Sequence, residues 1–404
     1  MRTLIRGIGK LVTPTGTKPA SGSHLESLET CTNAAVLIEN GIIQTVFSDA
    51  SRTDTHVDHV IDAEGRMAIP GFVDPHTHLV FAGHREKEFI ARANGEPYTG
   101  GGILATAEAV ARASLEELIE CGRRFIREML GRGTTTVEVK SGYGLAVEAE
   151  LKQLRAIAAL QKSEAARIVP TFLGAHAFPP DQSRSAYIQS IIHQMLPVVA
   201  SEQLAVYCDV FCDRGFYTVD ESRAILGAAG AAGLRPKLHA DELADTGGAA
   251  LAAEIGATSA DHLICANEEG LIRMRDAGVI PVLLPGTSFT LGADYAPARR
   301  MIALDLPVAL ATDFNPGTSL ICAMPTVISL AVMKLGMSAA QALTAATLNA
   351  AAALDLSDRV GTLEQGKVAD LLLLDIDSVD QLAYFFDHNP VDTVVVGGRV
   401  VYDR

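Results

Sequence analysis

Eight short apolar runs that alternate with helical stretches are the feature that most limits what this chain can fold into. The helical stretches are amphipathic or Ala-rich, as in residues 114–130 and 147–161, where apolar residues recur three and four positions apart. Repeated βα units of this kind close most simply into a (β/α)8 barrel. The sixth run is weak by itself, and we count it because seven others surround it. The runs are "FVDPHTH", "TTTVEVKSGYG", "RIVPTFLGAHAF", "AVYCDVFCD", "RPKLHADE", "TSADHL", "VIPVLLPGTSF" and "PVALATDFNPG".

The two ends of the chain have a different character from its middle. Residues 34–48 contain two short strand patterns joined by an Asn-Gly turn, and "GKVADLLLLD" and "DTVVVGGRVVYDR" near the C-terminus are similar. We therefore predict an α/β fold with a (β/α)8 TIM-type barrel over residues 69–354. Residues 1–68 and 355–404 are expected to combine into a small β-sandwich, and a chain of 404 residues is long enough for both units.

Composition and charge narrow the class of function. The net charge of −15 argues against a nucleic-acid partner, because phosphate binding needs clustered Lys and Arg. No apolar stretch is long enough to span a bilayer, and "MRTLIRGIGKLVTP" lacks the apolar core of a signal peptide. Six scattered cysteines suit a reducing compartment. We expect a cytoplasmic protein, and a small anionic substrate stays possible because one buried Arg can bind it.

Polar residues at the C-terminal ends of the predicted strands indicate a metal site. His76 and His78 lie two apart on an extended segment, so both imidazoles face the same way while Thr77 points away. By itself an H-x-H pair is as often accidental as functional. With His239 at the end of the fifth run and Asp313 at the end of the eighth, it forms a plausible site for Zn²⁺ or Fe²⁺. Such a metal can lower the pKa of a bound water to about 7.

Three further side chains lie at the same end of the predicted barrel. Glu242, three residues past His239, could act as a general base and then a general acid, although a Glu that supports a helix dipole is the alternative. His262 could hydrogen-bond the water or the developing oxyanion, or could be a core histidine. His176 has the same alternative and is expected to contact the substrate rather than the metal.

The segments just beyond the strands offer substrate contacts. Arg85 could bind a substrate carboxylate through two parallel hydrogen bonds, although a solvated surface Arg is an equal alternative from the residue alone. Tyr143, flanked by glycines, is expected to contact a ligand. Lys140 lies on the second run, whereas the carbamylated Lys of two-metal barrels belongs to the fourth, so we interpret it as a supporting residue and expect one metal. The segment after the eighth strand presents Asn315, Gly317 and Thr318 to the same pocket, and "YTGGGI" near residue 100 is expected to be a mobile rim segment.

The complete pattern resembles the amidohydrolase superfamily. The H-x-H after the first strand, the His with a downstream Glu on the fifth, the His on the sixth and the Asp on the eighth carry this resemblance. Within it, "PGFVDPHTHLVFAGHRE", "EVKSGYGL", "FLGAHAFP", "HADE" and "TDFNPGTS" resemble the imidazolonepropionase family. The resemblance covers nearly the whole chain and implies hydrolysis of the cyclic amide of 4-imidazolone-5-propanoate to N-formimidoyl-L-glutamate, the third step of L-histidine degradation.

The resemblance also implies a set of roles. It implies a cytoplasmic enzyme, commonly a homodimer, with one divalent metal per subunit, Zn²⁺ or iron, with zinc slightly favoured. It places the metal on His76, His78, His239 and Asp313. It makes Glu242, His262 and Asp313 catalytic. It assigns substrate contacts to Arg85, Tyr143, His176 and Glu242, with Asn315, Gly317 and Thr318 on the product side.

Two rival functions remain open from the sequence. A single-metal purine or pyrimidine deaminase shares the ligand set, but a neutral base has no carboxylate for Arg85 to bind. A barrel that has lost catalysis and serves in assembly would be expected to lack a ligand or Glu242, and all five residues are present.

Overall fold

Eight parallel strands form the wall of a barrel in the computed structural model, which describes residues 1–48, 56–95 and 102–404. The strands neighbour one another in chain order. Each falls within one of the eight apolar runs, so the predicted (β/α)8 barrel is confirmed. The strands are β6 (Phe72–Asp74), β7 (Thr134–Lys140), β8 (Arg167–Ala175), β9 (Tyr207–Cys212), β10 (Arg235–Ala240), β11 (Ser259–His262), β12 (Ile280–Leu283) and β13 (Ala309–Leu310).

The barrel closes where the segments that follow β6 and β13 meet. The backbone N–H of Asp313 donates to the carbonyl of His76 at 3.0 Å, and the N–H of His78 donates to the carbonyl of Phe314 at 2.9 Å. Thr77 pairs with Phe314 as a parallel bridge, and its side chain donates to the carbonyl of Glu138. Closure therefore brings the predicted ligands of the first and eighth runs side by side, with Thr77 pointing away as expected.

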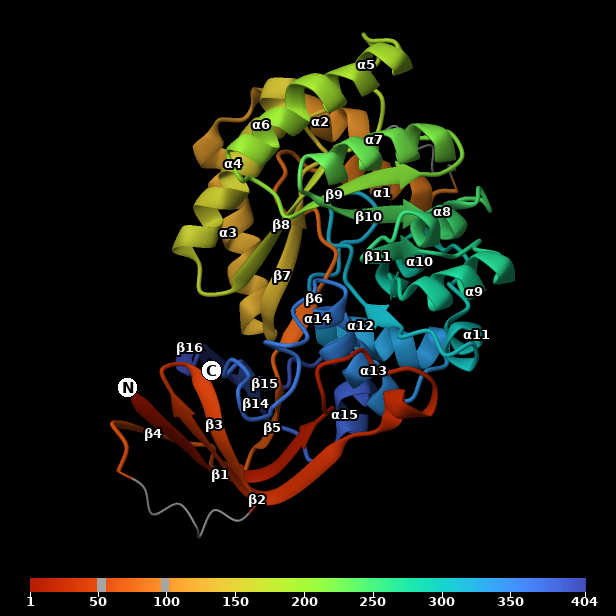
Figure 1. Cartoon of the computed structure of the whole chain (residues 1–404). Helices are drawn as coiled ribbons and strands as arrows, with labels where there is room; N and C mark the ends of the chain where they lie inside the picture. The colour runs from red at the N-terminus through yellow and green to blue at the C-terminus, as the bar shows by residue number, and fades with distance from the viewer. Residues whose placement is uncertain (49–55, 96–101) are drawn as a thin grey trace.

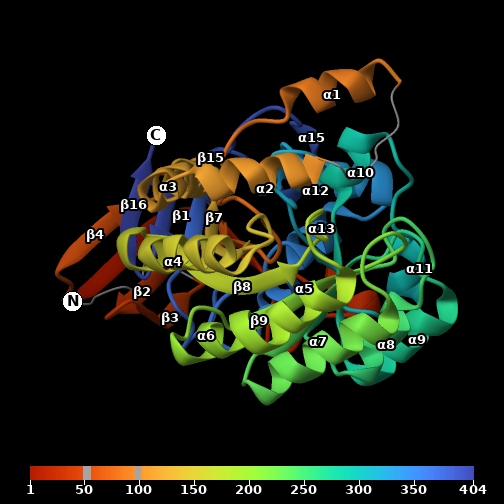
Figure 2. The same cartoon turned by 90° about the horizontal axis from the view of Figure 1, so that it is seen from above.

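Helices surround the barrel, and their sequences explain where they start. In α3, Ser114 and Glu117 form a capping box, and the apolar face carrying Leu118 and Ile126 is buried. Figure 2 shows α1 at the edge of the molecule, and none of its residues is buried. The helices are α1 (Glu86–Ala93), α2 (Gly102–Arg112), α3 (Leu115–Gly131), α4 (Val147–Ser163), α5 (Arg184–Ser190), α6 (Leu196–Ser201), α7 (Val219–Ala231), α8 (Gly248–Glu254), α9 (Glu268–Ala277), α10 (Pro285–Leu291), α11 (Ala298–Ala303), α12 (Met324–Leu330), α13 (Ala339–Ala345), α14 (Leu348–Ala352) and α15 (Val379–Tyr384), with a 3-10 turn η1 (Gly22–Glu26) and two π-helical turns, η3 (Ile191–Met195) and η4 (Ala331–Leu335).

The ends of the chain combine into a second sheet of eight strands below the barrel, where Figure 1 shows the red N-terminal and blue C-terminal strands side by side. The predicted Asn-Gly turn is present at Asn40 and Gly41, both with positive φ. The sheet curls, since the N–H of Ala369 donates to the carbonyl of Gly41, and it encloses an apolar core of its own. Its strands are β1 (Arg2–Thr13), β2 (Glu29–Glu39), β3 (Ile42–Phe47), β4 (His59–Asp62), β5 (Met67–Pro70), β14 (Leu371–Leu374), β15 (Val391–Val396) and β16 (Arg399–Asp403).

Two sequence expectations are not settled by the fold. The boundaries drawn at residues 68 and 355 stay a prediction, and the Gly-rich segment near residue 100 lies largely outside the described residues. Among the described residues, none of the helices has the length and apolar character needed to cross a membrane.

Candidate active site

An enclosed cavity of about 30 Å³ lies at the carboxyl ends of the barrel strands, where TIM-type barrels carry their chemistry. Ten of the predicted site residues line it, together with Ile103 and Phe211, which the sequence analysis missed. The ten are His78, Arg85, Tyr143, His176, His239, Glu242, His262, Asp313, Asn315 and Thr318. His76 lies directly behind them, with its ring centroid 4.5 Å from that of His239. The structure therefore brings the whole predicted ligand set together.

Three donor atoms converge on one point. Nε2 of His76 lies 3.3 Å from Nε2 of His78, and Oδ1 of Asp313 lies 3.4 Å and 3.6 Å from these two nitrogens. Four ligands at about 2.1 Å in a tetrahedral arrangement stand about 3.4 Å apart, so these separations fit a zinc-type site. Nδ1 of His76 lies 2.6 Å from the carboxylate of Asp261. When Nδ1 donates a hydrogen bond to this carboxylate, Nε2 carries no proton and is available to a metal.

His239 supplies the fourth predicted ligand. Two clusters of three histidines include it, and in each cluster the ring nitrogens that could bind a metal lie within 4.8 Å of one another. One cluster is His76, His239 and His262, and the other is His78, His176 and His239. Nδ1 of His239 lies 3.0 Å from Oδ2 of Asp209, whereas Nε2 makes no hydrogen bond among the described residues. Because buried imidazole nitrogens are rarely left without a partner, this observation fits a metal held at this point.

The charge state of the buried groups agrees with metal binding. Burial lowers the pKa of His76 and of His78 well below 6.5, so both imidazoles are neutral, which is the form that binds metals. Burial also raises the pKa of Asp313 to about 6. At pH 7 the three converging donor atoms therefore belong to two neutral imidazoles and one carboxylate, a set that suits a divalent cation.

Glu242 and His262 face each other across the cavity. Oε1 of Glu242 lies 3.7 Å from Nδ1 of His262. Burial, followed by the charges of Asp313 and Asp213, raises the pKa of Glu242 well above 4.5. Asp213 also holds the loop that carries Glu242, because its Oδ2 accepts the backbone N–H of Glu242 at 2.7 Å and of Leu243 at 2.8 Å. A raised pKa of this kind suits a carboxyl group that first takes and then gives a proton.

The backbone is strained where the strands end. Asp241, His262, Leu263 and Asp313 all have φ between 50° and 74°, a region that residues other than Gly rarely adopt. Such strain persists only when the surrounding structure enforces it, and it gathers at functional sites. Here it aims His262 and Asp313 into the cavity.

Arg85 is buried at the rim of the cavity. Its Nε and Nη2 donate to the carboxylate of Glu88 at 2.8 Å and 2.7 Å. A Cβ on Gly317 would stand 2.1 Å from Nη1 of Arg85, so the absence of a side chain there makes room for the guanidinium. Gly317 therefore shapes the cavity through Arg85 and does not line it.

Tyr143 and His176 form one wall. The ring of His176 stacks on that of His78 with centroids 5.0 Å apart, and Nδ1 of His176 lies 3.0 Å from the carbonyl of Gly142. Gly142 has φ +113°, which lets the chain turn sharply before Tyr143. The buried carboxylate of Glu150 accepts the backbone N–H groups on both sides of Tyr143 and so fixes this turn.

Asn315 uses its side chain to build its own loop. Its Oδ1 accepts the N–H groups of Gly317 and Thr318, and its Nδ2 donates to the carbonyl of Asp313 and to the hydroxyl of Thr318. Asn315 and Thr318 line the cavity. Their contact with a product stays a prediction.

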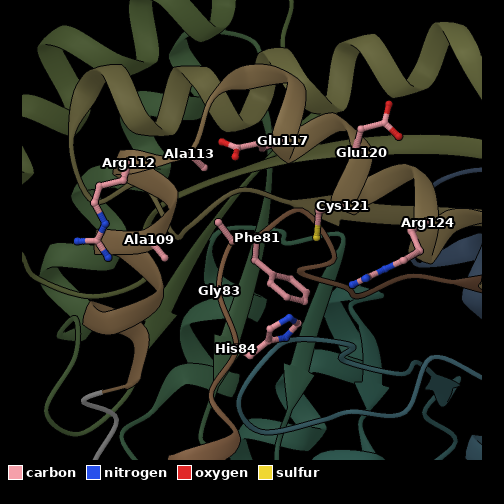
Figure 3. Close-up of a pocket in the computed structure, with 11 residues that line it drawn as sticks. Phe81, Gly83, His84, Ala109, Arg112, Ala113, Glu117, Glu120, Cys121 and Arg124 are labelled. Atoms are coloured by element: carbon pink, nitrogen blue, oxygen red, sulfur yellow. The ribbon is translucent and has the colours of Figure 1, made fainter.

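A larger cavity, of about 710 Å³, is lined by none of the predicted site residues. Figure 3 shows it between the segment from Phe81 to His84 on one side and α2 and α3 on the other. Its walls mix Glu and Arg side chains, and none of the groups of side chains that could hold a metal includes a residue of these walls. The small enclosed cavity is therefore the candidate active site.

Fold and site together define a metal-dependent hydrolase of the amidohydrolase class. The model of the Amidohydrolase family matches residues 67–401. Among solved structures, E. coli guanine deaminase superposes with a TM-score of 0.76 over all of both chains at 18% identity, and a triazine hydrolase variant gives 0.76 at 19% identity over all of this chain and 95% of the other. At these identities the likeness shows the fold alone.

Sequence relatives define the particular family. The imidazolonepropionase of Geobacillus kaustophilus is 46% identical over 99% of this chain and 98% of its own length, and that of Symbiobacterium thermophilum is 48% identical over 99% and 97%. The chain belongs to the amidohydrolase family and, within it, to the imidazolonepropionases. The resemblance inferred from its motifs is confirmed.

Proposed function

We propose that the protein hydrolyses the cyclic amide of 4-imidazolone-5-propanoate to N-formimidoyl-L-glutamate in the degradation of L-histidine. The observation that carries this proposal is one cavity that combines three converging metal-ligand atoms, the carboxyl group of Glu242 with its raised pKa, and the buried guanidinium of Arg85. Relatives named imidazolonepropionase, matched over nearly the full chain, support the choice of substrate.

The metal would be held by His76, His78, His239 and Asp313, with zinc as the ion that we propose first. The near-tetrahedral spacing of the donor atoms supports this assignment, and so does Nε2 of His239, which makes no hydrogen bond among the described residues. When bound, the ion supplies positive charge that polarises the amide carbonyl and makes a water more acidic. One metal per subunit is proposed, because no lysine stands on β9 to bridge two ions.

Glu242 moves the proton in this scheme. Its carboxylate takes a proton from the attacking water as the water oxygen bonds to the carbonyl carbon of the ring. The same carboxyl then gives that proton to the ring nitrogen as the C–N bond breaks, so the ring opens to a carboxylate and a formimidoyl amine. His262, 3.7 Å from Glu242, is placed to stabilise the charge that develops on the carbonyl oxygen. When the tetrahedral centre collapses to a carboxyl group, the remaining proton of the water is released, and Asp313, beside Nε2 of His76 and of His78, would accept it on its way to solvent.

Arg85 gives the site its preference for an anionic substrate. A guanidinium binds a carboxylate through two parallel hydrogen bonds, which fixes the propanoate chain and therefore the ring. Tyr143 and His176 would contact the ring from the side, Asn315 and Thr318 would contact the product, and Gly317 would act only by making room for Arg85. We further propose that the enzyme acts in the cytoplasm as a homodimer on this small molecule, with no nucleic-acid partner.

The test is incubation of the zinc-loaded protein with freshly prepared 4-imidazolone-5-propanoate. We expect loss of the ultraviolet absorbance of the ring, one N-formimidoyl-L-glutamate per ring consumed, and no ammonia. The matched control is the same imidazolone ring with a propyl chain, which we expect to react with a kcat/KM about 100-fold lower because Arg85 has no carboxylate to bind. Ammonia release from purines or pyrimidines, with no reaction of the imidazolone, would replace this proposal with a deaminase.

A further inference from the structure

A layer of five buried charged side chains lies beneath the candidate metal site. It contains three carboxylates, Glu138, Asp209 and Asp261, and two lysines, Lys140 and Lys237. All five side chains have 0% exposure. Burial of charges at this density costs folding free energy unless each is paired, so a layer of this kind calls for a functional reason.

Two carboxylates of this layer contact metal-ligand histidines. Oδ2 of Asp261 lies 2.6 Å from Nδ1 of His76, and Oδ2 of Asp209 lies 3.0 Å from Nδ1 of His239. Oδ1 of Asp209 also accepts the backbone N–H of His239 at 3.1 Å. A carboxylate beside Nδ1 fixes the ring and keeps the proton on that nitrogen, which leaves Nε2 for the metal.

One lysine joins these two carboxylates. Nζ of Lys140 lies 2.8 Å from Oδ2 of Asp209 and 3.6 Å from Oδ2 of Asp261, and it also contacts Glu138 at 2.9 Å. Burial alone would lower the pKa of Lys140, but Asp209, Glu138 and Asp261 together raise it, so the ammonium stays charged. Lys237 is equally buried, yet its Nζ contacts Glu138 at 3.1 Å and the carbonyl of Pro75.

We infer that Lys140 is a positioning residue that orients His76 and His239 together for the metal, through Asp261 and Asp209. The inference rests on the proposed metal site. It assigns to one cation the alignment of two ligands that come from opposite parts of the chain. Lys237 shares the layer and its burial, and its charge also acts on Asp261, but it makes no contact with Asp209 that matches that of Lys140; it therefore serves as the comparison that keeps the cation beside Asp209.

The test compares two pairs of substitutions that leave the net charge of the layer unchanged. Glu138→Gln with Lys140→Met removes the bridging cation, whereas Glu138→Gln with Lys237→Met keeps it. Both remove one positive and one negative buried charge, so the two metal-free proteins should melt at similar temperatures. Zinc affinity of each is measured by competition with a chromophoric chelator, with no substrate present.

We expect the dissociation constant for zinc to rise 10- to 100-fold in the Lys140 pair, the usual effect of removing a group that orients a ligand. In the Lys237 pair the dissociation constant for zinc should stay within about threefold of the value for the Glu138→Gln single variant. Equal losses in the two pairs would overturn the inference. Absence of zinc binding by the wild-type protein would instead overturn the proposed metal site.

A second set of variants keeps the inference testable if the first Lys140 variant does not fold. The two variants of this set combine Asp261→Asn, in place of Glu138→Gln, with either Lys140→Met or Lys237→Met. In this set only the Lys140 substitution removes the cation beside Asp209. We therefore again expect the variant without Lys140 to bind zinc more weakly than the variant without Lys237. The reverse order, or equal affinities, would contradict the role given to Lys140.

Discussion

At the scale of single residues, the site works because burial fixes the protonation state of each group. Burial keeps the imidazoles of His76 and His78 neutral and raises the pKa of both Glu242 and Asp313, that of Asp313 to about 6. Each shift has burial as its largest cause. Burial of the site therefore also sets the pKa values of the proposed ligands and of Glu242.

Zinc affinity should depend on pH through Asp313. Its pKa of about 6 in the metal-free protein means that the ligand is ionised at pH 7 and protonated at pH 5. Because metal binding displaces this proton, the apparent dissociation constant for zinc should rise by about tenfold for each pH unit below 6 and level off above 7. Chelator competition from pH 5 to 7.5 measures this. An affinity that does not change over this range would contradict the assignment of Asp313 as a ligand.

The residues that we propose as metal ligands stand out in the sequence, but the residues that we propose to orient them do not. His76, His78, His239 and Asp313 are conspicuous because they stand at the ends of apolar runs. Asp209 and Asp261 lie inside "YCDVFC" and "SADH", where their carboxylates look like those of any strand. Their contacts with His239 and His76 join residues far apart in the chain, and only the closed barrel shows them.

At the scale of elements, the loops after the strands set the shape of the cavity. The cavity lined by the described residues has a volume of about 30 Å³. The loop after β13 is one wall of this cavity, and it meets α1 where the side chain of Arg92 donates to the carbonyl of Gly317.

Gly317→Ala should weaken substrate binding without removing any polar group. The added Cβ would stand 2.1 Å from Nη1 of Arg85, so the guanidinium has to shift. We expect KM to rise about tenfold, with a smaller change in kcat, since displacing a positioned ion pair costs about 1.4 kcal/mol or more. Steady-state kinetics measure this.

Gly227→Ala is the matched control for this substitution. Gly227 lies in α7, and no atom lies within 4 Å of the position of an added Cβ. KM should not change, and the helix should gain stability because Ala favours it over Gly. A rise in KM of equal size in both variants would show that the effect of Gly317→Ala does not come from Arg85.

At the scale of the whole molecule, the metal is expected to stabilise the fold as well as to supply chemistry. Its proposed ligands come from the ends of β6, β10 and β13, so the ion links parts of the chain that are distant in sequence. At a free zinc concentration 100-fold above the dissociation constant, linkage predicts about 2.7 kcal/mol of added stability.

Calorimetry of the metal-free protein at increasing zinc concentrations tests this linkage. The melting temperature should rise with zinc in the wild-type protein. It should not rise in His78→Asn, because the shorter amide side chain does not reach the position of the Nε2 atom that would bind the metal. A rise of the same size in both proteins would place the stabilising zinc at another site.

The architecture was predictable because its periodicity is strong. Each of the eight apolar runs contains one barrel strand, and the Asn40–Gly41 turn lies where the hairpin was expected. The closed cavity and the curled terminal sheet could not be predicted, because they depend on how side chains pack after the barrel closes. The π-helical turns η3 and η4 leave no signal in apolar periodicity either.

The most direct test of this account is the rate of ring opening by zinc-loaded wild-type protein and by Glu242→Gln. Glutamine keeps the size of the side chain but cannot carry the proton, so kcat should fall by a factor of about 10² to 10⁴ while zinc content and melting temperature stay the same. Loss of activity with an intact metal site would establish the proton transfer by Glu242. Undiminished turnover of 4-imidazolone-5-propanoate by Glu242→Gln would contradict the mechanism, and no turnover by the wild-type protein would contradict the assigned reaction.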